Sequence, residues 1–187
     1  MVNTIERRFN AELRLSNDGK KIVGYAAVYD KSSEDLGGFI EYVRPGAFDR
    51  SLKTLPDVRA LINHDSNLIL GRTLSGTLLL GSDSTGLEVN ISPPDTSYAK
   101  DLMVSMARGD ITQMSFAFTT AKDDWQLVEG QRTRSLLDLD LVDVSVVTYP
   151  AYTDTSVAVR SLQDWNKISR REQFERRARA LRLHKQK

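Results

Sequence analysis

Asp110-Ile-Thr-Gln-Met-Ser-Phe-Ala-Phe-Thr-Thr120 is the stretch that decides the fold, because its side chains alternate as they do on a β-strand. Met114, Phe116 and Phe118 fall on one face, and this apolar face predicts a sheet that packs on a core. The opposite face is small and polar, with room beside Ser115 for another group. Most serines in strands only satisfy a local hydrogen bond, so the chemistry of Ser115 depends on its neighbours.

Alternating segments bounded by turn residues surround this strand on both sides. Further strands are expected over residues 5–15, 22–29, 39–43, 58–62, 69–80, 86–91 and 134–148. Asn17-Asp-Gly19 and Glu129-Gly130 are expected hairpin turns, because glycine tolerates the positive φ that tight turns need. A short helix is expected after Pro45, and a longer one from about Ser97 to Arg108, capped by Asp95 or Thr96 and ended by Gly109. The pattern predicts a mainly β fold with a few α-helices.

The composition and net charge exclude a few classes of function and favour none strongly. The chain has 187 residues, 40% of them hydrophobic and 27% charged, with a formal net charge of +1. These values suit a globular domain and favour neither nucleic acid nor a strongly acidic partner. The chain has no cysteine, which excludes disulfides, a thiolate nucleophile and cysteine zinc ligands. No apolar run approaches the roughly 18 residues of a membrane span, and no signal-peptide core begins the chain, so a soluble cytosolic protein is expected.

The composition shifts near the C-terminus. Residues 166–187 hold nine Lys or Arg against two Glu, with apolar side chains at fair helical spacing. We therefore expect a folded domain over residues 1–160 and a basic, helical tail over residues 161–187. The tail fits a solvated helix, a docking arm for an acidic partner, or a segment that is removed on activation.

His64 is the one histidine of the expected folded domain, since His184 lies in the basic tail. It follows the apolar run 58–62, between Asn63 and Asp65, where a strand opens into a loop, and such positions often carry catalytic groups. A serine hydroxyl needs a base to become a nucleophile, and histidine suits that role. A lone histidine is more often structural, so a third group is needed to support the catalytic interpretation.

The last strand offers a carboxylate for that third position. In the run from Leu141 to Thr148, Asp143 lies on the same face as Ser145, among β-branched residues. A carboxylate there is costly to bury without a partner, and an imidazole is a suitable one. Asp140 and Asp65 stay open as alternatives, and Asp143 also fits a surface carboxylate on a sheet with one wet face.

Other chemistries have less support. Metal-dependent hydrolysis needs several His, Asp or Glu ligands, and the domain has a single histidine. The chain has no glycine loop that would cradle a phosphate, and the expected barrel lacks a basic stripe with exposed aromatics. No cofactor, metal, nucleic acid or membrane partner is therefore expected.

With these residues in hand, the chain resembles the prohead (capsid-maturation) serine proteases of tailed bacteriophages, which are related in fold to herpesvirus assemblins. The resemblance spans residues 12–159 and rests on the order of several short motifs. They are Gly24-Tyr-Ala-Ala-Val-Tyr29, Arg44-Pro-Gly-Ala-Phe48, Asn63-His-Asp65, Leu70-Gly-Arg-Thr73, Met114-Ser-Phe-Ala-Phe118 and Asp143-Val-Ser-Val-Val-Thr-Tyr-Pro-Ala151.

The resemblance implies an assemblin-like β-barrel with His64 as general base and Ser115 as nucleophile. The third member is a histidine in assemblins and acidic in phage relatives, which implies Asp143 here. The assemblin oxyanion hole uses an arginine-containing loop, but residues 149–155 contain no arginine. Arg72 is a candidate electrostatic helper or else one half of a structural ion pair.

The resemblance also implies a function: a serine endopeptidase that cleaves the scaffold or delta segment of the phage major capsid protein, and itself, during procapsid maturation. Its place would be the host cytoplasm, inside the assembling procapsid. Self-association stays open, because assemblins act as dimers but no apolar stripe marks an interface. The alternative is a non-catalytic phage assembly factor that uses the same fold to bind scaffold or capsid protein.

Overall fold

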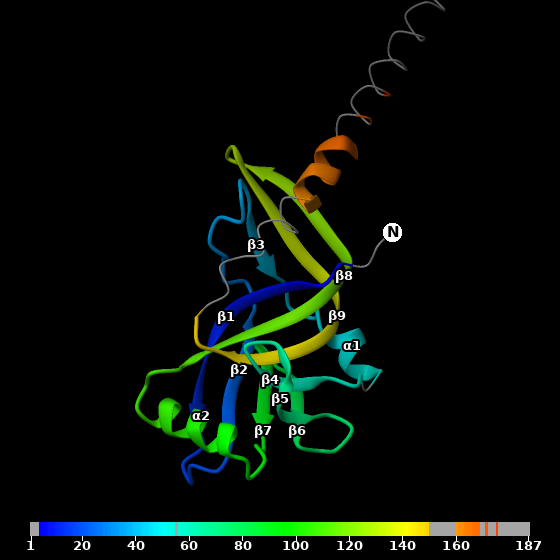
Figure 1. Cartoon of the computed structure of the whole chain (residues 1–187). Helices are drawn as coiled ribbons and strands as arrows, with labels where there is room; N and C mark the ends of the chain where they lie inside the picture. The colour runs from blue at the N-terminus through cyan, green and yellow to red at the C-terminus, as the bar shows by residue number, and fades with distance from the viewer. Residues whose placement is uncertain (1–3, 55, 150–159, 169–170, 172–174, 176–187) are drawn as a thin grey trace, which may run out of the picture.

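The computed structural model describes residues 4–54, 56–149, 160–168, 171 and 175. Nine strands and two labelled helices account for most of them (Figure 1). The strands are β1 Glu6–Leu15, β2 Ile22–Val28, β3 Ile40–Val43, β4 Arg59–Ile62, β5 Asp65–Arg72, β6 Leu78–Ser82, β7 Gly86–Ile91, β8 Gln113–Val128 and β9 Gln131–Val147. The helices are α1 Asp49–Lys53 and α2 Ser97–Ala107, and residues 160–168 form a further helical segment.

One strongly curled sheet carries the whole fold. Its strands run in the order β5-β4-β9-β8-β1-β2-β7-β6, and β3 pairs with β9 beside this path. The two ends of the path, β5 and β6, are joined by a turn and not by a strand ladder within the described residues. The fold is mainly β, as expected, but the sheet is a curled half-barrel where the resemblance implied a β-barrel.

The turn between β5 and β6 also corrects the strand expected over residues 69–80. Gly76 has φ +70°, and its N–H donates to the carbonyl of Thr73 at 3.0 Å. This closes a tight turn within the mostly polar stretch Arg72-Thr-Leu-Ser-Gly-Thr77, which separates the apolar residues of the two strands. The Ser75-Gly76 pair is a turn signal that marks the break in the sequence. The other expected strands match the observed ones closely.

The β8–β9 hairpin is the longest element, with strands of 16 and 17 residues that turn at Glu129-Gly130 (Figure 1). The outer half of β8 is largely exposed, whereas residues 114–119 of the same strand are buried on both faces. The face that carries Ser115 is therefore enclosed. Strand β8 lies between β1 and β9 in the middle of the sheet and pairs with both of them.

The main core is built around aromatic rings. Phe116 packs edge-on against Phe48 at 5.6 Å between ring centroids and stacks with Phe118 at 5.2 Å. All three are fully buried, and burial of each is worth roughly 1.5–3 kcal/mol. Helix α2 adds Leu102 and Met106 to this core, as its apolar spacing predicted. The core thus fixes the middle of β8, where Ser115 lies.

Helix α2 begins at the expected place but without the expected cap. Thr96 occupies the N-cap position, and its hydroxyl makes no capping hydrogen bond. At the other end, Gly109 has φ +81° and donates its N–H to the carbonyl of Met106 at 3.0 Å. The glycine terminates the helix in the predicted manner.

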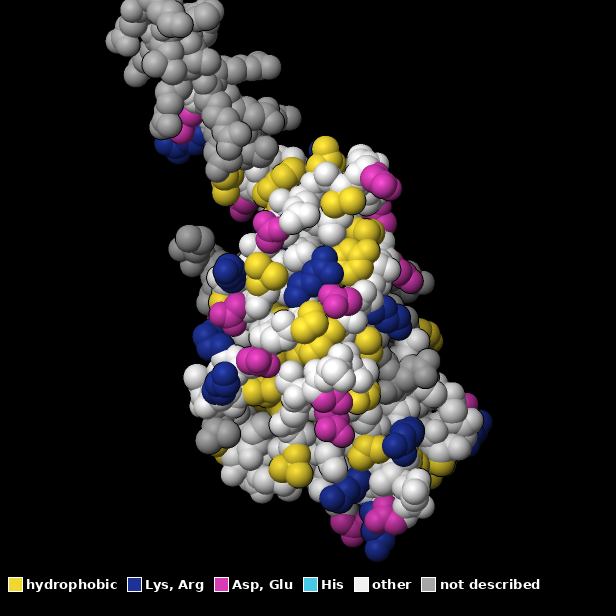
Figure 2. All heavy atoms as spheres, turned by 180° about the vertical axis from the view of Figure 1, so that it is seen from behind, with side chains coloured by type: hydrophobic (Ala, Val, Ile, Leu, Met, Phe, Trp, Pro, Cys, Tyr) yellow, Lys and Arg dark blue, Asp and Glu magenta, His cyan; other side chains and the backbone are white. Residues whose placement is uncertain are grey.

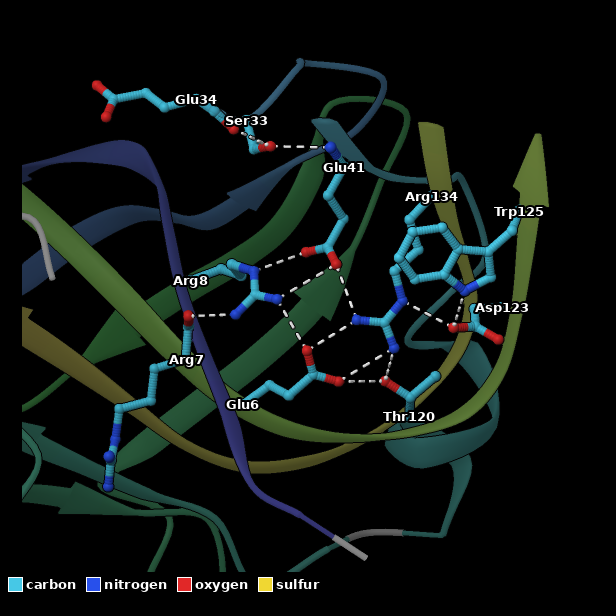
Figure 3. Close-up of polar contacts among 10 residues, drawn as sticks. All are labelled: Glu6, Arg7, Arg8, Ser33, Glu34, Glu41, Thr120, Asp123, Trp125 and Arg134. Atoms are coloured by element: carbon cyan, nitrogen blue, oxygen red, sulfur yellow. Dashed lines mark hydrogen bonds and ion pairs between the residues drawn. The ribbon is translucent and has the colours of Figure 1, made fainter. Parts of the chain in front are cut away.

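A buried network of charges joins four strands (Figure 3). Arg8 on β1 bonds Glu41 on β3 at 2.7 Å and Glu6 on β1 at 2.8 Å. Arg134 on β9 bonds Glu6 at 2.8 Å, Glu41 at 3.0 Å and Asp123 on β8 at 2.7 Å. Both arginines, Glu6 and Glu41 are at most 6% exposed, so their charges depend on one another.

The buried charge network lowers the pKa of Glu6. Burial raises the pKa of Glu6, but the charge and hydrogen bonds of Arg134, the Arg8 charge and the Thr120 hydroxyl outweigh it, and the net pKa lies below its ordinary value of 4.5. The carboxylate is accordingly held in its charged form.

A second, smaller core forms where the helical segment 160–168 meets the β8–β9 hairpin (Figure 1). Leu162 is buried against Leu36 and Phe39. Trp165 stacks on Trp125 of β8, with 5.7 Å between centroids and 21° between the ring planes. The described start of the expected tail is thus helical and packed on the sheet. Residues 150–159, just before the expected boundary, and most of the tail after residue 168 lie outside the described residues.

Acidic, basic and apolar side chains are interspersed over the face of the molecule seen in Figure 2. In the described part of the chain, no helix has both the length and the apolar character needed to cross a bilayer.

Candidate active site

His64 lies in a two-residue turn between β4 and β5. Ile62 pairs with Asp65, and the intervening Asn63 and His64 have φ of +52° and +57°. Two successive left-handed residues are the geometry of a type I′ hairpin turn, and asparagine is favoured in it. The turn projects the imidazole from the end of the hairpin towards the neighbouring strand β9.

Strand β9 brings the other two predicted residues to this turn. It pairs in parallel with β4, which places Leu61 beside Ser145, and antiparallel with β8, which places Ser115 opposite Ser145. Asp143 lies two residues before Ser145 and so on the same face of the sheet. The central position of β9 therefore gathers residues that are separated by up to 79 positions in the chain.

The three side chains form a continuous hydrogen-bonded line. His64 Nδ1 lies 2.6 Å from Asp143 Oδ1, and His64 Nε2 lies 2.8 Å from Ser115 Oγ. An ionised carboxylate only accepts hydrogen bonds, so Nδ1 must carry the proton. Nε2 of the neutral ring is then the acceptor for the Ser115 hydroxyl. This is the tautomer that a general base for Ser115 requires.

The line is shielded from solvent. Ser115 is 0% exposed, and the side chains of His64 and Asp143 are 9% and 12% exposed. Low exposure strengthens the hydrogen bonds to the carboxylate because solvent competes less for them. It also means that the Ser115 hydroxyl is enclosed in this conformation.

The two alternative aspartates have other partners. Asp140 pairs with Arg50 at 2.7 Å, and Asp65 accepts hydrogen bonds from the backbone and side chain of Asn67 at 2.8 and 2.9 Å. Of the three candidates, Asp143 is the one that contacts the imidazole.

Arg72 belongs to an ion pair. It binds Asp57 in bidentate fashion, at 2.6 Å from Nε and 2.7 Å from Nη2. The hydrogen bonds from Arg72 lower the pKa of Asp57 to about 2. This contact favours the structural role over the electrostatic helper.

The stretch 149–155, compared above with the assemblin oxyanion loop, lies outside the described residues except for Tyr149. Nowhere in the described part of the chain do three or more His, Asp or Glu side chains gather in a way that could hold a metal ion.

Ser145 is a polar member of the site that the sequence analysis did not select. It is fully buried, and its hydroxyl lies within 3.2 Å of both Asp143 and His64. The available signal was its position two residues after Asp143 on the same strand face.

Comparison with known proteins shows the family to which the chain belongs. The model of the family described as caudovirus prohead serine protease matches residues 5–168. The chain belongs to this family. It is also 29% identical, over 169 residues, to the prohead protease of Enterobacteria phage HK97, covering 82% of this chain and 71% of the relative. No solved structure matches the chain significantly.

Family membership gives this prohead serine protease its general role. It is a serine-type peptidase related to phage proteins, and it acts in the assembling procapsid. The family match also covers the helical segment 160–168, which extends beyond the region of resemblance recognised in the sequence.

Proposed function

We propose that Ser115, His64 and Asp143 form the catalytic triad of a serine endopeptidase that cleaves the scaffold or delta segment of the phage capsid protein, and itself. The observation that supports this best is the unbroken line of contacts, 2.8 Å from Ser115 to His64 and 2.6 Å from His64 to Asp143. The three groups come from separate strands and a strained turn, and this arrangement gives each the partner that acyl transfer needs.

The proposed reaction begins with attack of Ser115 Oγ on the peptide carbonyl, while Nε2 of His64 takes the hydroxyl proton. Asp143 stabilises the resulting imidazolium through Nδ1. The tetrahedral intermediate then collapses: the C–N bond breaks, and His64 returns the proton to the leaving amine. Water, deprotonated by His64, then attacks the acyl-enzyme. The ester C–Oγ bond breaks, His64 returns the proton to Ser115 Oγ, and the new carboxyl group is released. Such proton transfer typically contributes on the order of 10²–10⁴-fold to the rate.

Family membership supports the proposed substrate and location. The prohead role supports the major capsid protein and its scaffold or delta segment as partners, inside the procapsid in the host cytoplasm. Removal of an internal scaffold would free space for DNA. Self-cleavage is expected in the basic tail after about Leu162, or near the N-terminus, because the composition changes at the tail. We further infer that the curled half-barrel corresponds to the assemblin fold.

One observation favours the second candidate, a non-catalytic assembly factor. Ser115 is 0% exposed, and a hydroxyl with no accessible surface could serve only to satisfy the imidazole. The catalytic reading then requires that the enclosing groups move when substrate binds.

Co-expression with the capsid protein separates the two candidates. Wild type is compared with Ser115→Ala and His64→Ala, and with Ser51→Ala as a control that removes a buried serine hydroxyl elsewhere. If the chain is a protease, mass spectrometry should detect truncated capsid protein only on co-expression with wild type or Ser51→Ala. Equal truncation with all four chains, or with none, would favour the assembly factor. An intact tail in the mature chain would exclude cleavage there.

A further inference from the structure

Ser145 is the polar group of the site that the proposed reaction does not consume. It is 0% exposed and lies on β9 directly opposite Ser115. A buried hydroxyl among valines is unfavourable unless its hydrogen-bonding capacity is used. The Ser145 hydroxyl forms hydrogen bonds with two other members of the site, His64 and Asp143.

The hydroxyl has one proton, and the geometry assigns it. Ser145 Oγ donates to Asp143 Oδ1 at 2.9 Å. Its lone pairs face two N–H groups of His64, the backbone N–H at 3.2 Å and the ring Nδ1 at 3.2 Å. One side chain thus holds the carboxylate and the histidine at the same time.

The backbone contact matters because His64 is in a conformation that residues other than glycine seldom adopt. Both Asn63 and His64 have positive φ, and such residues persist where the surrounding structure fixes them. On the His64 side, the bond to Ser145 supplies this restraint. On the Asn63 side, its N–H donates to the Val146 carbonyl at 2.9 Å, and its side chain exchanges bonds with Thr148 at 2.9 and 3.2 Å.

We propose that Ser145 is a positioning residue of the active site, which locks the His64 turn onto β9 and fixes the Nδ1–H tautomer through Asp143. Asn63 is the second half of the same lock. The proposal rests on the triad proposed above. It adds Ser145 as the group that aligns the two contacts of the triad, His64 with Asp143 and His64 with Ser115.

Ser145→Ala tests this role, with Ser51→Ala as the matched control. Ser51 is also a buried serine, 3% exposed, and accepts the backbone N–H of Leu141 on the same strand at 3.1 Å. A hydrogen bond to a charged group is lost only in Ser145→Ala. We expect capsid-protein truncation during co-expression to slow by roughly 10- to 100-fold in Ser145→Ala and to stay near the wild-type rate in Ser51→Ala.

NMR spectroscopy tests the alignment of His64 without a measurement of proteolytic activity. The chain has two histidines, so His184→Gln leaves His64 as the only imidazole to observe by ¹⁵N and ¹H NMR. In this background we expect a protected Nδ1–H resonance and the nitrogen shifts of a single tautomer. Ser145→Ala should broaden or remove that resonance and mix the tautomers, whereas Ser51→Ala should leave both features in place.

Asn63→Gly probes the other half of the lock with little risk to the fold, because glycine accepts positive φ. It should also slow truncation and weaken the Nδ1–H signal.

The outcomes are distinguishable. Absence of capsid processing by wild type would overturn the proposed function, while the NMR comparison would still decide the role of Ser145. Wild-type processing rates and an unchanged Nδ1–H resonance in a folded Ser145→Ala chain would refute the lock. If Ser145→Ala does not fold, the same two measurements on Asn63→Gly decide the question.

Discussion

Replacing Arg134 by methionine should destabilise this protein strongly, because it leaves buried carboxylates without enough positive charge. Arg134 is 3% exposed and binds Glu6, Glu41 and Asp123 at 2.7–3.0 Å. In the variant, Arg8 alone would face both Glu6 and Glu41, so the buried group would carry a net charge of about −1. Methionine retains much of the side-chain volume, so packing changes little.

Breaking a buried ion pair by removing one partner costs about 3–5 kcal/mol. Arg8 still pairs with both glutamates, so we expect the lower end, about 3 kcal/mol. For a chain of this length, that corresponds to a fall in Tm of about 6–12 °C. Differential scanning calorimetry and urea titration at neutral pH would measure both quantities.

Two variants make this test specific. Arg50→Met removes an arginine that also binds two carboxylates, Asp138 and Asp140, but is 47% exposed, so its effect should be small. Combining Arg134→Met with Glu6→Gln restores charge balance, so the pair should recover part of the loss. A loss for Arg134→Met no greater than for Arg50→Met, or no recovery in the double variant, would refute the reasoning.

Two further predictions follow from the same structure. The pKa of Glu6 is lowered in the folded chain, so its stabilising contribution is present above its ordinary pKa of 4.5 and is lost as the pH falls below that value. Urea unfolding between about pH 6 and about pH 3 should show this loss in wild type and a weaker one in Glu6→Gln; parallel curves would contradict it. Gly86→Ala should cost at least roughly 1–3 kcal/mol, because an added Cβ would lie 1.9 Å from the carbonyl oxygen of Ala27. Gly81→Ala is the control, with Glu88 Oε2 as its nearest neighbour at 3.6 Å, and equal urea midpoints for the two variants would argue against this close approach.

Local pattern was sufficient to predict most elements. Alternation defined β1, β8 and β9, and glycine positions defined the turns at Gly19 and Gly130, both of which have positive φ. These features depend on residues close in sequence. The break between β5 and β6 was missed because the apolar residues on its two sides, Ile69-Leu70 and Leu78-Leu80, were joined into one strand in spite of the Ser75-Gly76 turn signal between them. The half-barrel was missed as well, since sheet closure depends on how distant strands curl.

The site was accessible to sequence reasoning only in part. His64, Ser115 and Asp143 could be chosen because each residue type has a chemical need that the others meet. The choice of Asp143 over Asp140 and Asp65 depends on strand register, which pairs β9 with β4 and β8 and was not visible in sequence. The network around Arg134 was missed for the same reason, because it joins residues as far apart as 128 positions.

The contact between Trp125 and Trp165 has a practical consequence. These are the two tryptophans of the chain, and both lie in one stacked pair between the hairpin and the helical segment 160–168. Excited states of adjacent parallel indoles couple, so the fluorescence and ultraviolet optical activity of the chain report mainly on this one junction. Detachment of the helix, or its loss by cleavage, would therefore be visible in real time in unlabelled protein.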